Sequence, residues 1–353
     1  MLDQVKHWVK ANPWRLGAIV LGLGLIGTVS AMALSGDSVE APRDDSSTTL
    51  AASSPGETAP EADDGPSLGL DPSGSAEGLG SAYVSVKVDN APGARPQVGL
   101  AGVPLLVEYP VEGGISRFVA VVTREATGEL GPVRSLRSVD ADLLATVAPY
   151  VVSTGGQPFV LQEVEASGVS MIDPQLFELF TTGVNPEPVH NLFLLLEELF
   201  LTVGDTPPLG DGFPAGAFPG GSAATEITLP FESVSYRYES DVYIRYDGAT
   251  QHEVLDAIGG SAGPLAHDTV AVLFVAERPA GYTDGNDVPV TTFDVIGLGD
   301  LLVFHQGQVV EGTWLRGAHE EGYRFFDGDG EPFGLPQGRI YVALVPRGSE
   351  VGY

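Results

Sequence analysis

The C-terminal part of the chain, from about Phe231 to Arg347, is a series of short apolar segments, and this pattern limits the fold more than any other feature. Segments such as DVYIRYDG, TVAVLFVAE and RIYVALVP are rich in β-branched and aromatic residues and are separated by Gly, Asp and Asn. Such segments between turn residues are typical of strands joined by hairpins. We therefore expect residues 231–348 to form an antiparallel β domain, either a sandwich or a partly open barrel.

Residues 82–204 combine two patterns. YVSVKV, PLLVEY and RFVAVVT indicate strands, whereas Ser138–Ala148 and Asn191–Leu201 indicate helices, with Ser138 as an N-cap. This mixture predicts an α/β N-terminal ectodomain, and hence an α+β class for the whole chain. Residues 205–230, which include PPLGDGFPAGAFPGG, are predicted to be a linker.

The segment Leu16–Leu34 contains no charged residue and follows the basic stretch MLDQVKHWVKANPWR. As a helix it would be about 28 Å long, close to the roughly 30 Å hydrocarbon core of a bilayer. Basic residues before it place residues 1–15 in the cytoplasm. We therefore predict a signal anchor, a single-pass transmembrane helix at residues 16–34, with the later domains outside the cell membrane. A cleaved signal peptide, with Ala31-Met32-Ala33 as the cleavage site, is the alternative.

The amino-acid composition predicts the state of residues 35–81 and excludes several classes of function. Residues 35–81 are rich in Ser, Gly, Pro and acidic residues and have no aromatic residue, so they are predicted to be a disordered acidic stalk. The chain carries 47 Asp and Glu against 17 Lys and Arg, a formal net charge of −30, which argues against nucleic-acid binding. Cysteine is absent, which excludes disulfides, a thiolate nucleophile and acylation of a lipoprotein cysteine.

Arginine is concentrated in one short stretch of this acidic chain, around the motifs VEGGISRF and GPVRSLRSVD. The residues are Arg95, Arg117, Arg124, Arg134 and Arg137. An unpaired buried charge costs several kcal/mol, so each guanidinium must be paired, solvated or bound to an anion. Pairing with Asp89, Glu108, Glu112 or Asp140 would give a purely structural ion-pair network. The other interpretation is a site for carboxylate or phosphate, which guanidinium groups bind through two hydrogen bonds.

Other motifs carry less weight. Gly22-Leu-Gly24-Leu-Ile-Gly27 lies inside the apolar span without a preceding strand, so it does not indicate a dinucleotide site. The sequence Asp327-Gly-Asp329-Gly-Glu331 lacks full calcium-loop spacing and predicts a hairpin turn. No histidine pair has metal-ligand spacing. We therefore expect no metal and no cofactor.

Several of these motifs, in the right order, resemble the YerB-like putative lipoprotein family of bacteria. The resemblance spans VKVDNAPGARPQVGL, VEYPVEGGISRF, GPVRSLRSVD, VHNLF, GQVVEGTWLRG and RIYVALVP, roughly residues 82–347. It implies paired N- and C-terminal domains outside the membrane of a bacterial cell, and no established activity. The cysteine that usually anchors relatives is replaced here by the apolar segment. Residues that fall on matching positions are Asp89, Arg95, Glu112, Arg117, Arg134, Arg137, His190, Asn191, Arg245 and Trp314.

Two functions are consistent with these observations. The first is a membrane-tethered envelope protein whose arginine-rich site binds an anionic cell-wall component or a partner protein. The alternative is a cell-wall hydrolase that uses Glu112 or Asp140 with His190 as acid and base. No nucleophile or metal set is visible, so the sequence leaves open whether the protein is an enzyme.

Overall fold

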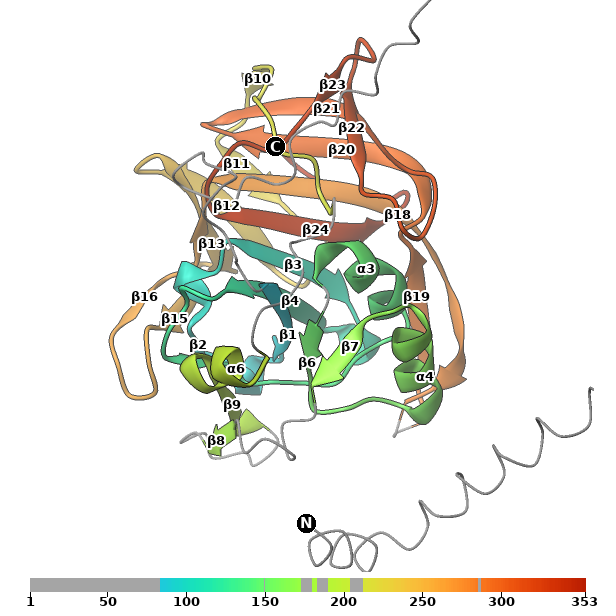
Figure 1. Ribbon diagram of the computed structural model, residues 1–353. Coiled ribbons are helices and arrows are strands. Elements are labelled where there is room, and N and C mark those ends of the chain that lie inside the picture. The colour runs from blue at the N-terminus through green and yellow to red at the C-terminus, as the bar shows by residue number, and fades with distance from the viewer. Residues whose placement is uncertain (1–82, 149, 173–179, 183–189, 204–211, 285–286) are drawn as a thin grey trace, which may run out of the picture. The chain divides into compact units, whose positions relative to one another are not determined.

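The computed structural model describes residues 83–353, except 149, 173–179, 183–189, 204–211 and 285–286 (Figure 1). The transmembrane helix predicted at 16–34 and the stalk predicted at 35–81 lie outside the described residues. Within those that are described, no helix is both long enough and apolar enough to span a membrane.

The largest sheet contains strands from both predicted regions. Its main order is β23-β22-β21-β20-β18-β24-β3-β4-β1-β6-β7. The N-terminal strands are β1 (Tyr83–Asp89), β3 (Leu105–Pro110), β4 (Ser116–Thr123), β6 (Tyr150–Val152) and β7 (Ser170–Ile172). The C-terminal strands are β18 (Thr269–Thr283), β20 (Gly297–His305), β21 (Gln308–Arg316), β22 (Arg324–Asp327), β23 (Pro332–Phe333) and β24 (Ile340–Pro346). Two further strands, β10 (Ser222–Ala223) and β19 (Pro289–Asp294), pair with β21 and β18.

Strand β24 joins the two halves of this sheet. It lies between β18 and β3 and runs parallel to both, as the red and teal strands of Figure 1 show. Its sequence, IYVALVP, is buried over almost its whole length. Continuous apolar runs are typical of strands that are covered on both faces. The expected pairing of the C-terminal region is therefore wrong in one respect: its sheet is mixed rather than purely antiparallel, because β18 and β24 are parallel.

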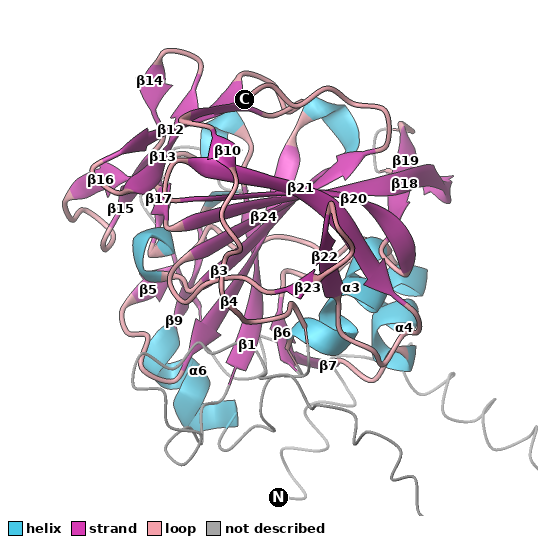
Figure 2. Cartoon of the chain, turned by 90° about the horizontal axis from the view of Figure 1, so that it is seen from above, coloured by secondary structure: helices cyan, strands magenta, loops and turns pink. Residues whose placement is uncertain are grey.

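Three smaller sheets and several helices surround the large sheet (Figure 2). One sheet contains β11 (Glu226–Thr228), β12 (Val234–Glu239), β13 (Val242–Asp247), β14 (Thr250–Gln251) and β17 (Ala266–His267). The others contain β2 (Gln97–Val98), β15 (Glu253–Leu255) and β16 (Ala262–Pro264), and β5 (Glu129–Leu130), β8 (Phe180–Thr182) and β9 (Leu192–Leu195). The helices are α3 (Val139–Val147), α4 (Pro158–Ala166) and α6 (Leu196–Val203), with 3₁₀ turns η1 (Pro92–Ala94), η2 (Leu100–Gly102) and η3 (Glu112–Gly114).

Some of the helices and strands predicted from the sequence are confirmed, and others are wrong. The strand and helix expected at YVSVKV and Ser138–Ala148 are confirmed as β1 and α3, although Ser138 makes no capping hydrogen bond through its side chain. The helix expected at Asn191–Leu201 is wrong at its start, because Leu192–Leu195 is a strand that pairs with β5 and β8. Short apolar runs do not distinguish a strand from a buried helix. Residues 222–228, expected in the linker, include β10 and β11.

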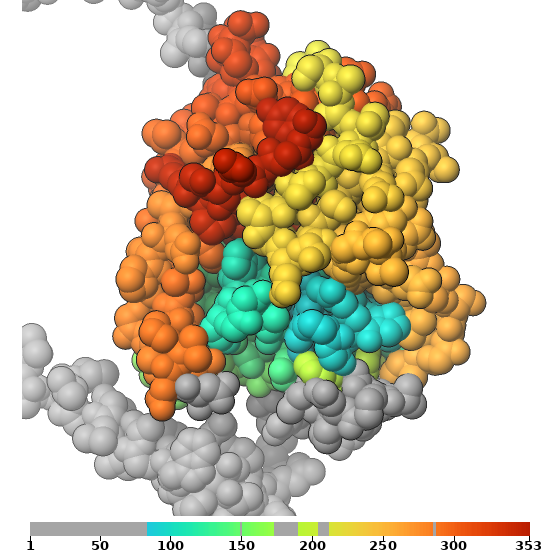
Figure 3. Space-filling model, turned by 180° about the vertical axis from the view of Figure 1, so that it is seen from behind, coloured from blue at the N-terminus to red at the C-terminus, as the bar shows by residue number. Residues whose placement is uncertain are grey.

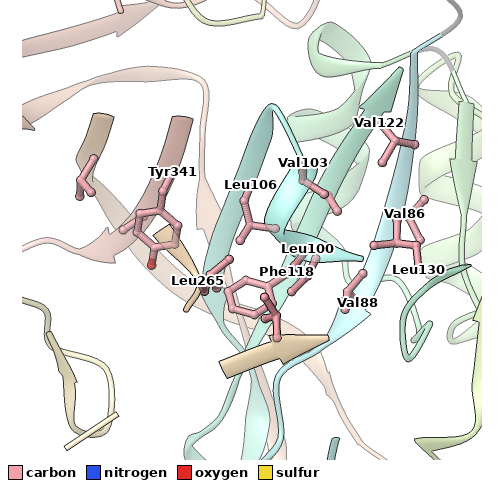
Figure 4. Packing of buried hydrophobic residues seen from close by; sticks show 14 of the residues in the cluster. Val86, Val88, Leu100, Val103, Leu106, Phe118, Val122, Leu130, Leu265 and Tyr341 are labelled. Atoms are coloured by element: carbon pink, nitrogen blue, oxygen red, sulfur yellow. The ribbon is translucent and has the colours of Figure 1, made fainter. Parts of the chain in front are cut away.

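Alternation along the strands separates two buried faces. On β1, Val86 and Val88 point into a cluster that also contains Leu106, Phe118 and Tyr341 (Figure 4). Because side chains of a strand alternate between faces, the intervening polar residues of β1 point to the opposite face. The apolar cluster contains residues from both predicted regions, so the two regions share a core.

Candidate functional site

Asp89, the last residue of β1, is the centre of a group of charged side chains. Its carboxylate is fully buried, and Arg117 Nη1 lies 2.5 Å from its Oδ1. Arg117 is directly opposite Asp89 on β4. Arg134 Nε and His190 Nδ1 lie 2.6 and 2.9 Å from Asp89 Oδ2. Side chains from three separate parts of the chain therefore meet on one buried carboxylate.

The charge of Asp89 follows from these contacts. Burial alone would raise the pKa of Asp89, but the charge of Arg117 and the hydrogen bond from the Ala91 backbone N–H outweigh it. Arg134 and His190 act in the same direction, so the pKa lies below its ordinary value of 3.8. Asp89 is thus ionised at neutral pH and holds Arg117 and Arg134 in place.

Arg137 forms a second ion pair, with Glu112 of η3. Arg137 Nε donates to Glu112 Oε2 at 2.9 Å, and its Nη2 donates to Oε1, so the carboxylate is bound at two points. Burial would raise the pKa of Glu112, but the hydrogen bond and charge of Arg137 lower it below 4.5. Glu112 is therefore ionised at neutral pH and is a poor proton donor.

A buried triad of Lys87, Tyr109 and Asp140 supports the backbone of Arg137. Asp140 Oδ2 accepts the Arg137 backbone N–H at 2.7 Å, and its Oδ1 accepts from Tyr109 Oη at 2.6 Å and Lys87 Nζ at 3.1 Å. Desolvation lowers the pKa of Lys87 to about 8, although Asp140 opposes this shift. Both oxygens of Asp140 are thus used to fix the start of α3.

Arg117, Arg134 and Arg137 line one open pocket of about 670 Å³, which we call the arginine pocket. Arg117 is almost fully buried, and among the described residues its Nε–H has no hydrogen-bond partner. An unsatisfied buried donor costs about 1–3 kcal/mol. Three guanidinium groups therefore line the pocket, and one of them, that of Arg117, has a buried Nε–H without a hydrogen-bond partner among the described residues.

The remaining walls come from both predicted regions. Glu112, Thr154 and Gln157 line the pocket from the N-terminal region, and Tyr282 lines it from the end of β18. The Tyr282 ring packs edge-on against Phe159 of α4, with ring centroids 4.5 Å apart. In Figure 3 the orange β18–β19 hairpin lies beside the teal segment that contains η3. A carboxylate, Asp284, also lines this outer side, where it accepts the backbone N–H of Val288.

Two arginines expected at the site lie elsewhere. Arg245 is fully buried, and its Nη1 and Nη2 lie 2.5 and 3.1 Å from the two oxygens of Glu108. Arg95 pairs with Asp247, with Nη1 3.0 Å from Oδ2. Because Glu108 and Tyr109 are successive residues of β3, they face opposite sides of the sheet. The Arg245 network is thus on the face opposite the Lys87 triad.

The predicted site residues therefore divide into groups. The structure brings together Asp89, Glu112, Arg117, Arg134, Arg137 and His190, and separates Arg95 and Arg245 from them. Asn191 is partly exposed next to His190. Trp314 is a core residue whose Nε1 donates to the Phe274 carbonyl. Arg124 lies over the Phe200 ring.

Sequence reasoning missed Lys87, Tyr109 and Tyr282. Lys87 had a usable signal, because it is a charged residue within a strand whose neighbours are apolar. Tyr282 had none, since it reaches the pocket only through the pairing of β18 with distant strands. In the part of the chain that the structure describes, no group of His, Cys, Asp and Glu side chains could hold a metal ion.

Comparisons with known proteins agree on one family. Residues 72–205 match the N-terminal domain, and residues 227–342 the C-terminal domain, of the proteins of unknown function called DUF3048. The "Putative lipoprotein YerB" of Bacillus subtilis (strain 168) is 24% identical over 285 residues, covering 74% of this chain and 81% of that protein. A crystal structure of the Bacillus subtilis YerB protein has a TM-score of 0.63 at 21% identity, covering 77% of this chain and 94% of that chain. These matches confirm the resemblance drawn from the motifs and show a shared fold.

Proposed function

Since the chain belongs to the YerB-like family with paired DUF3048 domains, we propose that it is an extracytoplasmic envelope protein that binds an anionic group in the arginine pocket. The anion would belong to a cell-wall component or to a partner protein. One observation carries the proposal: Arg117, Arg134 and Arg137 reach the same open pocket from different segments. Guanidinium groups that serve only as structural partners do not need a shared opening of this size.

The ion pairs in the pocket are compatible with binding. Asp89 contacts Arg117 through Nη1 and Arg134 through Nε, and a guanidinium has five N–H donors. Arg134 is about one quarter exposed, with a side-chain exposure of 26%. A paired guanidinium can therefore still donate to a ligand oxygen while its carboxylate partner keeps it oriented.

A retention assay with purified cell-wall material at low salt tests this function. We expect the full-length protein to be retained, Arg134→Ala to lose most retention, and Arg134→Lys to weaken it, because lysine keeps the charge but loses the planar fork. Arg324→Ala is the matched control, since it removes one positive charge from an exposed side chain outside the pocket. No retention of the wild type, or equal retention of all four proteins, would refute the proposal.

The location in the cell is part of the same proposal. The apolar segment 16–34 and the description of the YerB relative as a lipoprotein both support membrane association. We expect the protein in the membrane fraction, with residues 83–353 accessible to protease in spheroplasts. A soluble secreted form that begins near Leu34 would instead indicate cleavage after Ala31-Met32-Ala33.

The hydrolase alternative has less support. Asp140 is fully buried and bound to Lys87, and Glu112 has a lowered pKa because Arg137 binds it at two points. A general acid needs a raised pKa and access to substrate. The arrangement of these carboxylates therefore favours binding over acid catalysis.

A further inference from the structure

The two carboxylates that pair with the arginines of the pocket are held differently. Asp89 is fully buried and contacts Arg117, Arg134, His190 and the Ala91 backbone N–H. Glu112 is 12% exposed in its side chain and lines the arginine pocket itself. Removing Asp89 would leave the buried guanidinium of Arg117 uncompensated, whereas Glu112 makes its direct ion pair with Arg137 at the pocket wall.

The backbone around Glu112 is suited to movement. Gly113 and Gly114 follow it with φ angles of 80° and 74°, in the left-handed region that glycine adopts without strain. A Cβ atom added at either glycine would meet nothing within 4 Å, so the turn is surrounded by open space on that side. Glu112 therefore lies on a turn that has both the conformational freedom and the room to shift.

The Glu112–Arg137 contact also indicates which ligand group fits. The planar carboxylate of Glu112 already binds the Arg137 guanidinium through two hydrogen bonds. The hydroxyls of Ser135 and Thr154 lie 3.1 Å apart, and both residues line the same pocket. These groups can donate to a second oxygen or accept from an amide of the same ligand.

We propose that the Glu112 side chain is an internal substitute for the ligand, and that the arginine pocket binds a carboxylate-bearing molecule whose carboxylate displaces Glu112 from Arg137. This inference rests on the proposed anion-binding function and names its ligand class. Exchanging the Glu112 carboxylate for the ligand carboxylate on the Arg137 guanidinium gains little free energy of binding. Affinity must therefore come from the remaining contacts in the pocket, and loss of the Glu112 charge should strengthen binding rather than weaken it.

The test is a titration of the full-length protein in detergent with N-acetylalanine, followed through the NMR signal of the Arg137 Nε–H. We expect Glu112→Gln to bind about five- to tenfold more tightly than the wild type, because the competing charge is gone. Asp294→Asn is the matched control: it removes one acidic partner from an exposed arginine, Arg278, outside the pocket. Its affinity should stay within about twofold of the wild type.

Two further arms make the result specific. Glu112→Gln combined with Arg137→Gln, followed through the Nε–H signal of Arg117 in the same pocket, should lose the gain. N-acetylalaninamide, which lacks the charge, should not bind. Dimethyl phosphate should bind Glu112→Gln more weakly than N-acetylalanine does; tighter binding of the phosphate would overturn the assignment of ligand class.

The remaining outcomes separate the two proposals. If the wild type binds N-acetylalanine and Glu112→Gln binds it equally or more weakly, displacement is refuted while anion binding stands. If neither protein binds either anion, both proposals fail. Should Glu112→Gln not fold, the wild type gives the answer: the Glu112 carboxyl ¹³C signal must shift on saturation with N-acetylalanine, and an unchanged signal refutes displacement.

Discussion

Glu108 and Arg245 are 137 residues apart in the sequence and form a fully buried ion pair, with Arg245 Nη1 2.5 Å from Glu108 Oε2. Glu108 also accepts hydrogen bonds from Asn90, Ser116 and Tyr341, so its charge is well compensated. The pair connects β3 with β13, two strands that lie in different sheets. The charge of a buried carboxylate such as Glu108 is compensated fully only when all of these donors are present.

We therefore predict a large loss of stability in Arg245→Ala. The change leaves Glu108 as an uncompensated buried charge, which should lower the free energy of unfolding by about 3–5 kcal/mol in urea titrations. Arg324→Ala, which removes an exposed arginine with a carboxylate 3.9 Å away, should cost less than about 1 kcal/mol. A loss in Arg245→Ala as small as in this control would mean that the pair adds little to the fold.

Arg117 and Arg134 should differ, although both bind Asp89. Arg117 is nearly buried and Arg134 is 26% exposed in its side chain. Arg117→Ala should therefore destabilise the protein by about 3 kcal/mol or more, and Arg134→Ala by about 1 kcal/mol. Thermal and urea unfolding of the two variants, compared with ligand retention, measure this difference. Equal losses of stability would show that Arg134 is as structural as Arg117.

Acid should weaken the fold through its buried carboxylates. Burial would raise the pKa of Glu108, but Arg245 and the hydrogen-bond donors lower it below 4.5. A carboxyl with a lowered pKa in the folded state stabilises the fold above its unfolded pKa, and this contribution is lost as pH falls through the folded value. Glu108→Gln should thus be less stable than the wild type at pH 7. In urea unfolding at several pH values, the difference should narrow below about pH 4; a constant difference would contradict the lowered pKa.

Lys87 should also make stability rise with pH, but in the alkaline range. Desolvation lowers its pKa from 10.5 to about 8, so the unfolded chain binds more protons than the folded protein between these values. Stability should then rise with pH across this window, by an amount on the order of 3 kcal/mol for Lys87 alone. Lys87→Met should lack this rise. If wild type and variant follow parallel curves from pH 8 to 10, the buried lysine does not titrate as we expect.

Local elements were predictable where the period was clear. The alternation of YVSVKV and the start of α3 near Ser138 are properties of short segments, and both appear in the structure. The position of β24 was not predictable, because a continuous apolar run such as IYVALVP fits between many partners. Which strands it joins depends on the packing of segments that are distant in the sequence.

The candidate site, like the fold, could be predicted from the sequence only in part. The concentration of arginines indicated a shared location, and three of them line one pocket. Their carboxylate partners were also within reach of sequence reasoning. The separation of Arg95 and Arg245 was not, because it depends on which face of the sheet each strand presents. Spacing along the chain does not fix that choice when register and partner are unknown.

The place of β24 has a consequence for the order in which the protein can be completed. Strand β3 is made early, and the strand that covers its second edge, β24, is made more than 200 residues later. At synthesis rates of about 5–20 residues per second, β3 keeps an open edge for on the order of ten seconds or more. During that interval the exposed edge can pair with other chains. The nascent protein would therefore benefit from a chaperone that shields β3 until β24 arrives.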